Sequence, residues 1–281
     1  MIHSYQTLPR VLTVAGSDSG GGAGIQADLK TITVLGGFGM SAITALTAQN
    51  TVEVRGIFDA TPEFVALQID AVVEDIGVDV IKTGMLANSG IVEVVADRIR
   101  MHGIRSVVVD PVMISKSSAR LLTDDAITAL KERLLPCATI VTPNVPEAEA
   151  LSGETIQGID GMRRAAEKIR ECGVGYVVIT GGHLSGEPID LLFDGRGFRE
   201  YRGERLAKPN THGTGCAFAA AIATYVGKGM EIERAIGQAK SFVTEAIRYG
   251  LGLGKGTGPV NVGYAVLRRS NEAGIILYDR V

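Results

Sequence analysis

One short segment of the sequence brings glycine, threonine and cysteine together where a helix is predicted to begin. Residues 210–216 read Asn-Thr-His-Gly-Thr-Gly-Cys and lead into a run of small apolar residues at 217–223. Two glycines one residue apart, Gly213 and Gly215, free the backbone to turn its N–H groups toward one point. The following helix adds its positive dipole end and unpaired N–H groups. This pattern is typical of a site for a phosphate, or for the charge that develops during phosphoryl transfer.

Cys216 lies in the first turn of that predicted helix. Because the helix dipole favours a thiolate, we expect a lowered thiol pKa and a base for an attacking hydroxyl. The alternative interpretations are a small residue packed under a sheet, and glycines that merely cap a buried helix. The spacing of neither a Walker P-loop nor a dinucleotide-binding motif is present, which argues against a P-loop kinase and a nicotinamide dehydrogenase.

The rest of the chain alternates short apolar runs with amphipathic segments. The apolar runs predict strands at 11–15, 41–46, 78–81, 107–109, 139–141 and 176–179. The periodic segments predict helices at 24–35, from Pro62, at 89–101, after a Thr123 N-cap, from an Asp160 cap to Gly173, at 213–228 and at 231–249. Residues 189–201 predict an antiparallel hairpin. This alternation predicts an α/β fold, a mostly parallel sheet covered on both faces, in a single domain over residues 1–281.

Polar and glycine residues follow the predicted strands. In parallel sheets, ligands bind beyond the carboxyl ends of the strands. The loops at those ends, where we expect the chemistry to lie, are residues 17–22, 83–85, 110–111, 142–144, 180–183 and 210–216.

Composition excludes several classes of protein. The chain is 46% hydrophobic and 21% charged, with a formal net charge of −3 and no block of like charge, so we expect no nucleic acid as a partner. No apolar run approaches the roughly 18 residues of a membrane span, and no signal peptide is apparent. Three cysteines, Cys137, Cys172 and Cys216, are odd in number and lack metal-binding spacing, which favours a reducing cytoplasm.

A resemblance to a known family covers essentially the whole chain. Residues 210–216 resemble the cysteine-bearing signature of the ribokinase-like superfamily. Residues 15–30, 44–51, 84–87, 110–113, 142–148 and 181–183 resemble, in order, the hydroxymethylpyrimidine/phosphomethylpyrimidine kinases of thiamine biosynthesis. The resemblance implies a ribokinase-like three-layer α/β/α fold. It also implies two successive phosphoryl transfers from ATP, first to 4-amino-5-hydroxymethyl-2-methylpyrimidine and then to its monophosphate.

The same resemblance assigns residues to the acceptor. Gln49 is similar to the family's pyrimidine-binding glutamine, and an amide offers the donor and acceptor that an aminopyrimidine edge needs. Its alternative interpretation is a polar residue that closes a strand. Asp28 corresponds to a residue near the substrate. Met85 corresponds to an apolar wall beside the ring, with Val112 as a further candidate for that wall.

It also assigns residues to the nucleotide and to Mg²⁺. Asn144 and Glu147 resemble the superfamily's Asn-x-x-Glu, and their spacing puts both on one face of a beginning helix. Glu147 and Asp110 are then the expected metal ligands, since Mg²⁺ takes few carboxylates together with water and phosphate oxygens. Without the resemblance, Glu147 reads as an ordinary first-turn acid. The residues expected on the nucleotide side are Asn144, Thr180, Gly182, Lys208 and Thr214.

The remaining expectations concern specificity and assembly. The resemblance implies a homodimer, and a mobile flap is predicted over residues 113–120, which include Lys116. Lys255 stands where the family suggests a histidine, which leaves the contacts of the C-terminal glycine segment open. The alternative functions are a pyridoxal/pyridoxine kinase of the same superfamily and a non-catalytic sensor of the pyrimidine.

Overall fold

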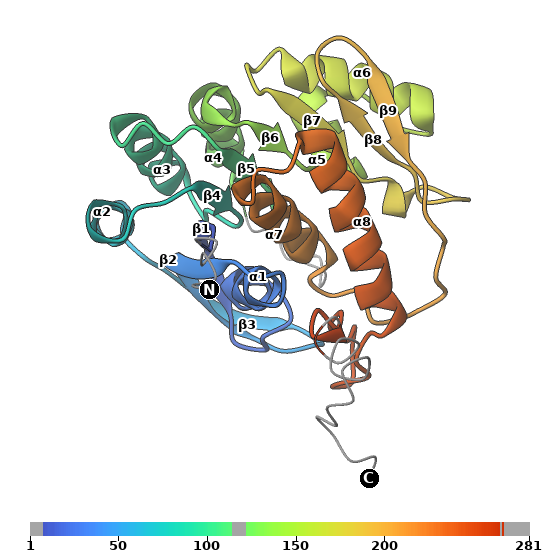
Figure 1. Ribbon diagram of the computed structural model, residues 1–281, viewed down its shortest axis with the longest axis horizontal. Helices are drawn as coiled ribbons and strands as arrows, with labels where there is room; N and C mark the ends of the chain where they lie inside the picture. The colour runs from blue at the N-terminus through green and yellow to red at the C-terminus, as the bar shows by residue number, and fades with distance from the viewer. Residues whose placement is uncertain (1–7, 114–121, 265, 267–281) are drawn as a thin grey trace, which may run out of the picture.

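A single sheet runs through the protein, whose computed structural model describes residues 8–113, 122–264 and 266 (Figure 1). In spatial order its nine described strands are β3 (Val54–Asp59), β2 (Phe38–Gln49), β1 (Arg10–Asp18), β4 (Val80–Thr83), β5 (Val107–Val109), β6 (Ile140–Val141), β7 (Tyr176–Ile179), β8 (Asp190–Phe193) and β9 (Phe198–Tyr201). The six strands from β2 to β7 pair in parallel, whereas β3, β8 and β9 are antiparallel additions at the two edges. The predicted mostly parallel sheet with an antiparallel hairpin is confirmed.

Helices cover both faces of this sheet, which gives the predicted three layers (Figure 1). One face carries α1 (Gly24–Val34), α7 (Thr214–Gly227) and α8 (Ile232–Arg248). The other carries α2 (Pro62–Asp75), α3 (Ser89–Met101), α4 (Asp124–Ala129), α5 (Val145–Ser152) and α6 (Ile159–Arg170). Because both faces are covered, β4 and β5 are buried throughout and β7 is buried from its second residue, and all three are rich in β-branched residues.

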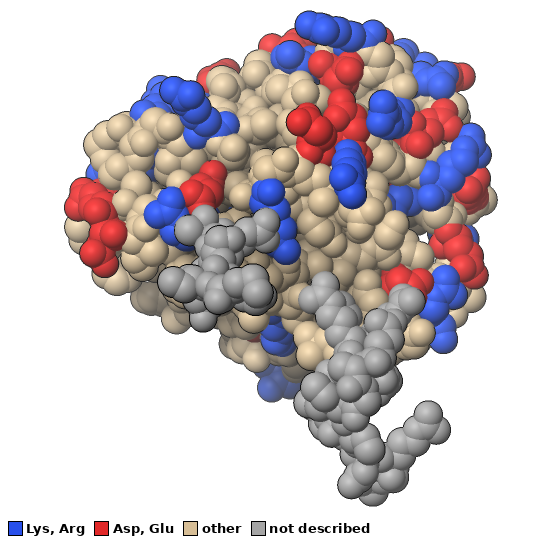
Figure 2. All heavy atoms as spheres, in the orientation of Figure 1, with Lys and Arg blue, Asp and Glu red and all other residues tan. Residues whose placement is uncertain are grey.

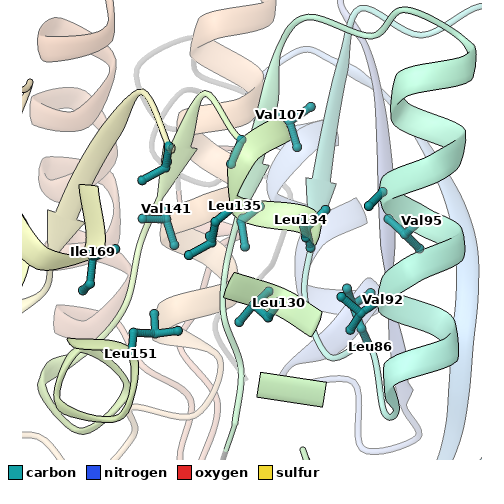
Figure 3. Packing of buried hydrophobic residues seen from close by; sticks show 14 of the residues in the cluster. Leu86, Val92, Val95, Val107, Leu130, Leu134, Leu135, Val141, Leu151 and Ile169 are labelled. Carbon is teal, nitrogen blue, oxygen red and sulfur yellow. The ribbon is translucent and has the colours of Figure 1, made fainter. Parts of the chain in front are cut away.

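The core under α3 shows how these layers pack. Val92 and Val95 of α3 lie against Leu130 and Leu134, while Val107 of β5 faces them from the sheet (Figure 3). Each of these side chains is at most 3% exposed. A π-helical turn, Leu130–Leu134, follows α4 directly and keeps the apolar side of that segment turned toward the sheet. This packing fixes the strand ends from which the polar loops emerge.

The structure corrects several local expectations. The β3 strand was not predicted, because it is an exposed edge strand and lacks the apolar run of a buried one. The N-cap of α6 is Gly158 and not Asp160, which lies in the first turn. Thr123 occupies the N-cap of α4, but its hydroxyl caps no backbone N–H. Cys137 ends a 3-10 turn, Leu135–Cys137, three residues before β6 begins. Apart from Met113, the predicted flap lies outside the described residues.

Two neighbouring glycines after β7 give a direct test of this backbone. A Cβ on Gly181 would lie 2.0 Å from the carbonyl oxygen of Ile189, whereas a Cβ on Gly182 would meet no atom within 4 Å. We therefore expect Gly181→Ala to lower the free energy of unfolding by at least about 2 kcal/mol. Gly182→Ala, on the exposed neighbour, should change it by less than about 1 kcal/mol. Urea unfolding followed by circular dichroism measures both, and equal stability of the two variants would contradict the predicted contact.

Candidate active site

Two cavities adjoin at the carboxyl ends of the parallel strands. The small cavity, of about 150 Å³, lies over the ends of β1, β2, β4 and β5. The large cavity, of about 360 Å³, lies over β6, β7 and α8. Asn144, Thr214 and Gly215 line both, so the two cavities share a border at the beginning of α7. This border is the point at which groups bound on either side would meet.

The beginning of α7 is built for an anion. Its N-cap, Gly213, has a φ of +82°, the left-handed region that glycine adopts without strain. A Cβ at Gly213 would also lie 1.8 Å from the carbonyl oxygen of Gly22, so only glycine fits. No side chain of the described residues caps the first-turn N–H groups. These N–H groups and the helix dipole therefore remain available to a bound anion.

A fully buried lysine lies beside this helix end. Lys82, the third residue of β4, places its Nζ 2.9 Å from Asp28 Oδ2 and 3.6 Å from Asp110 Oδ2. Burial would lower the pKa of Lys82, but the charges of Asp28, Cys216 and Asp110 outweigh it and raise that pKa. The ammonium group therefore stays charged and adds a positive charge at the wall of the small cavity.

Cys216 does not have the lowered thiol pKa that the sequence predicted. Its side chain lines the small cavity in the first turn of α7, as expected. Burial among protein atoms nevertheless raises the pKa of the thiol to about 12, helped by the charges of Asp110 and Asp28. Lys82 and a hydrogen bond from the Gly24 backbone act in the opposite direction and are outweighed. The group at this position is therefore a neutral thiol at neutral pH.

Asp110 and Glu147 form an acidic corner of the small cavity. Glu147 and Asn144 make a capping box at the beginning of α5: Glu147 N donates to Asn144 Oδ1 at 3.0 Å, and Asn144 N donates to Glu147 Oε2 at 2.9 Å. Burial, and then the charge of Asp110, raise the pKa of Glu147 to about 8. Burial likewise raises the pKa of Asp110, whose Oδ2 accepts no hydrogen bond.

This acidic corner bears on the expected metal ion. No group of three or more His, Cys, Asp or Glu side chains within the described ranges is arranged to hold a metal. Two buried carboxyl groups do fit a divalent cation, since Asp110 raises the pKa of Glu147 and Asp110 Oδ2 accepts no hydrogen bond. Mg²⁺ completes its octahedron with water and phosphate oxygens, so two carboxylates suffice.

The large cavity has an apolar wall and a polar wall. Phe218 of α7 with Val243 and Ile247 of α8 form an apolar side, to which a flat ring could bind. On the polar side, Lys240 Nζ lies 2.9 Å from Asp190 Oδ2, and Asp190 Oδ1 accepts a hydrogen bond from Gly181 N at 3.1 Å. This side connects the strand ends to the beginning of α7.

Most residues predicted for the site lie at these two cavities. The small cavity is lined by Cys216, Gly213, Gly215, Gln49, Met85, Val112, Asp110, Asn144, Glu147 and Thr214. The large cavity is lined by Thr180 and Gly182, together with the shared Asn144, Thr214 and Gly215. Met85 is held in place by a hydrogen bond from Thr44 Oγ1 to its carbonyl oxygen at 2.6 Å. The individual roles of these residues stay predictions.

Two predicted residues lie elsewhere. Asp28 is fully buried beneath the small cavity, where its Oδ2 accepts hydrogen bonds from Thr13 Oγ1 and Lys82 Nζ, and it does not line the cavity. It therefore reaches a bound molecule only through Lys82. Lys208 is exposed and lines neither cavity; Arg205, three residues earlier, lines the large one. The basic residue at the large cavity is therefore Arg205 and not the predicted Lys208.

Sequence reasoning gave no role to three residues of the small cavity, Lys82, Asp18 and His212. For Lys82 a signal existed, since a lysine in an otherwise buried β-branched strand requires a partner charge. His212 and Asp18 stood inside recognised motifs, but they are 194 residues apart, and only the fold shows that they pair.

The surface agrees with the charge pattern of the sequence. Acidic and basic side chains are interspersed on the face shown in Figure 2, and neither sign forms a continuous belt there. None of the helices in the described part of the chain combines the length and apolar character that a membrane crossing requires.

The fold and the paired cavities define a class of protein, a small-molecule kinase of the ribokinase-like type. Comparison with known proteins identifies the family. The family model described as "Phosphomethylpyrimidine kinase" matches residues 18–261, and the chain belongs to this family.

Individual relatives agree with this assignment. The chain is 50% identical over 257 residues to the hydroxymethylpyrimidine/phosphomethylpyrimidine kinase of Bacillus subtilis, covering 91% of this chain and 95% of that protein. It is 53% identical over 252 residues to the thiamine biosynthesis bifunctional protein ThiED of Geobacter sulfurreducens, covering 89% of this chain but only 51% of that longer protein. Among solved structures, an ADP complex of Bacillus subtilis pyridoxal kinase superimposes with a TM-score of 0.86 at 40% identity, covering 93% and 99% of the two chains.

The raised pKa of Glu147 predicts a dependence of stability on pH. Its folded-state pKa of about 8 lies above the unfolded value of about 4.3. Between these values the unfolded chain releases the proton first, so the free energy of unfolding of the cation-free protein falls as pH rises. Between pH 5.5 and pH 8, the free energy of unfolding should fall less for Glu147→Gln than for the unsubstituted protein. The difference between the two decreases should be at least about 1 kcal/mol. Glutamine keeps the capping box, which separates charge from helix capping.

Urea unfolding in EDTA at the two pH values measures this difference. Glu63→Gln, on the exposed first turn of α2, serves as the matched control and should follow the unsubstituted protein. If Glu147→Gln and Glu63→Gln lose the same stability between the two pH values, the carboxyl of Glu147 is not held protonated as described.

Proposed function

We propose that this protein transfers a phosphoryl group from ATP to 4-amino-5-hydroxymethyl-2-methylpyrimidine, and a second one to the resulting monophosphate, in thiamine biosynthesis. The observation that carries the proposal is the shared border of the two cavities at the beginning of α7. A phosphate held there has the large cavity on one side and the small cavity on the other. The names of the relatives supply the acceptor and the pathway.

The two cavities match the two halves of the reaction. The large cavity, with its apolar wall of Phe218, Val243 and Ile247, suits the base and ribose of a nucleotide. The small cavity, of about 150 Å³, suits a single substituted ring. At its walls, Gln49 offers an amide to the polar edge of a pyrimidine, and Met85 and Val112 offer apolar contact.

In this proposal, catalysis depends on the charges at the border of the two cavities. Phosphoryl transfer passes through a loose transition state, so catalysis depends on position and on stabilising charge more than on a strong base. The first-turn N–H groups of α7 and the ammonium of Lys82 converge on the place where that charge develops. Asp110 and Glu147 would hold Mg²⁺, which supplies further neutralisation of phosphate oxygens when bound.

A neutral Cys216 suits two different acceptors. The first acceptor is a hydroxyl, and the second is a phosphate that already carries negative charge. A fixed carboxylate beside the acceptor would repel that phosphate by about 1 kcal/mol or more at 4 Å. The thiol of Cys216, with a pKa of about 12, carries no such charge at neutral pH.

A coupled ATPase assay with Mg²⁺ tests the proposal, with hydroxymethylpyrimidine, its monophosphate and pyridoxal as separate acceptors. The proposal predicts turnover with both pyrimidines. Pyridoxal phosphorylation is the second candidate function, since a pyridoxal kinase is among the proteins of similar structure. Turnover with pyridoxal alone would replace the proposed substrate, and no turnover with any acceptor would leave a ligand-binding role.

The neutral thiol leads to a prediction about the two steps. Cys216→Asp places a carboxylate at the acceptor, so we expect kcat/KM for the monophosphate to fall at least about tenfold more than kcat/KM for the hydroxymethyl substrate. Cys216→Ser, which remains neutral, should reduce both steps by similar factors. Steady-state kinetics with each acceptor measures the two ratios. Equal losses in both steps for Cys216→Asp would contradict the argument from charge.

We further propose that the protein is a cytoplasmic, single-domain homodimer that assembles through its exposed β2–β3 edge. Leu46 and Phe58 are directly paired across these strands and are 51% and 72% exposed. Ile57 on β3 and Phe64 and Leu67 on α2 are exposed apolar residues nearby in the fold. An apolar group of this kind on an edge strand favours association with a second copy of the chain.

Light scattering after size-exclusion chromatography tests the dimer. The unsubstituted protein should elute as a dimer of the 29.5 kDa chain, and Phe58→Glu should shift it to the monomer because burying an unpaired carboxylate is costly. Met101→Glu, at an exposed site at the end of α3, is the matched control and should leave the dimer intact. A monomeric unsubstituted protein, or a Phe58→Glu variant that stays dimeric, would contradict this interface.

A further inference from the structure

Gln49, the residue that faces the substrate ring in the proposed function, is in contact with a histidine and a threonine. The structure places Gln49 Nε2 3.4 Å from His212 Nε2 and Gln49 Oε1 3.3 Å from Thr47 Oγ1. We propose that His212 is a positioning residue for Gln49: its Nε2 donates its one hydrogen to Asp18 and has no lone pair to accept from the amide nitrogen, which turns the amide oxygen toward His212 and the amide nitrogen toward Thr47, and so selects a ring with an amino group beside a ring nitrogen.

The charge of Asp18 determines the state of the neighbouring His212. Its Oδ1 accepts a hydrogen bond from Gly20 N at 2.8 Å, and its Oδ2 accepts hydrogen bonds from Gly22 N at 3.1 Å and Ala23 N at 2.8 Å. Burial opposes ionisation, but hydrogen bonds from His212, Ala23 and Gly20 outweigh it and lower the pKa of Asp18. Asp18 is therefore a carboxylate, which only accepts hydrogen bonds.

The carboxylate of Asp18 fixes the position of the hydrogen on His212. Nε2 of His212 lies 2.9 Å from Asp18 Oδ2, and a carboxylate oxygen at that distance requires a donor, so Nε2 carries a hydrogen. The ring has little freedom to turn away. His212 N donates to Gly258 O and its carbonyl oxygen accepts from Val260 N, while its Cδ2 occupies the space that a Cβ on Gly22 would need.

The hydrogen on His212 Nε2 determines the orientation of the Gln49 amide. An Nε2–H on His212 cannot accept from an NH₂ group, so an amide nitrogen beside it would set two donors against each other. The single hydrogen of the Thr47 hydroxyl is 3.0 Å from Ser17 O, its shorter contact, which leaves a lone pair facing Gln49. A half-turn of the amide exchanges oxygen and nitrogen in nearly the same space, removes this opposition of two donors at His212 and lets the amide nitrogen donate to Thr47 Oγ1.

The consequence for the substrate rests on the proposed function. After these contacts the amide keeps one oxygen lone pair and one N–H for a ligand. An aminopyrimidine edge has an exocyclic amino group beside a ring nitrogen, and it fits with the amino group toward the His212 side and the ring nitrogen toward the Thr47 side. A ring without the amino group leaves the amide oxygen without that partner, which costs affinity in a partly buried site.

Calorimetry with two matched ligands tests the proposal without requiring turnover. The ligands are hydroxymethylpyrimidine and its analogue without the exocyclic amino group, and the readout is the ratio of their Kd values. The unsubstituted protein should prefer the amino compound at least about tenfold. His212→Phe, which fills the space but offers no N–H, should remove most of that preference. His212→Gln, which can present an N–H at a similar place, should retain the ratio within about threefold of the unsubstituted protein.

A double substitution separates positioning from folding. In a Gln49→Met background the preference is already lost, so adding His212→Phe should leave the ratio of Kd values unchanged. If His212→Phe weakens both ligands equally in the Gln49 protein, His212 has only a structural role and the proposal is wrong. The same holds if His212→Phe changes the ratio equally in the Gln49 and Gln49→Met proteins.

A spectroscopic measurement decides the orientation even if neither ligand binds, an outcome that would overturn the proposed acceptor. In ¹⁵N-labelled protein we expect the His212 Nε2 signal of a protonated nitrogen, and cross-peaks from the Gln49 side-chain NH₂ protons to the Thr47 methyl group. These cross-peaks should be absent in Gln49→Met. Cross-peaks from the Gln49 NH₂ to the His212 ring protons instead, or an unprotonated Nε2, would overturn the inference.

Discussion

The positive end of α7 is the constraint on which the site depends. A helix end free of side-chain caps must lie against the sheet at the border of two cavities, and this requires the backbone of Gly213 to pass close to the carbonyl of Gly22. No other residue fits there, because a Cβ would overlap that oxygen and the φ angle lies in the left-handed region. The buried, apolar body of α7 fixes the helix on the sheet, with Phe218 turned to the large cavity. The anion site is therefore rigid before any ligand arrives, and it needs little reorganisation when charge develops.

That positive end, together with Lys82, requires balancing charge from the protein. Two buried carboxylates beside Lys82, Asp28 and Asp110, provide it, whereas burial and the charge of Asp110 favour the neutral form of Glu147. This arrangement explains why Cys216 is a neutral thiol, because the same carboxylates that keep Lys82 charged also disfavour a thiolate. A helix N-terminus alone favours a thiolate, as the sequence suggested, but the local dipole is weaker here than burial and two nearby carboxylates. The chemistry of the first turn is therefore set by residues from β4, β5 and α1 as much as by the helix itself.

The sequence predicted the strands whose residue pattern is clear because they are buried, and it did not predict the strand whose residues are exposed. The strands of β5 and β7 were predicted at their observed bounds because they are buried on both faces and continuously β-branched. The β3 strand was missed because its residues face solvent at the sheet edge. At the site, each residue at the end of a parallel strand was foreseeable, since the carboxyl ends of such strands meet. The pairs Lys82–Asp28 and His212–Asp18 join residues that are far apart in the sequence. No local sequence pattern could therefore predict them.

The two kinds of charge in the site have different tasks, and the fold keeps them apart. Lys82, Asp28 and Asp110 lie at or beneath the wall of the small cavity, and in the proposed reaction they act through the field they produce. Asp18 lies to one side, where its acceptors are already filled by three backbone N–H groups and His212. The charge of Asp18 determines that Nε2 of His212 is a donor. The same nitrogen of His212 faces Gln49. In the proposed function, this chain of contacts orients the amide that binds the ring. Recognition of the ring and stabilisation of the transferred group thus rest on separate residues, and a change in one need not disturb the other.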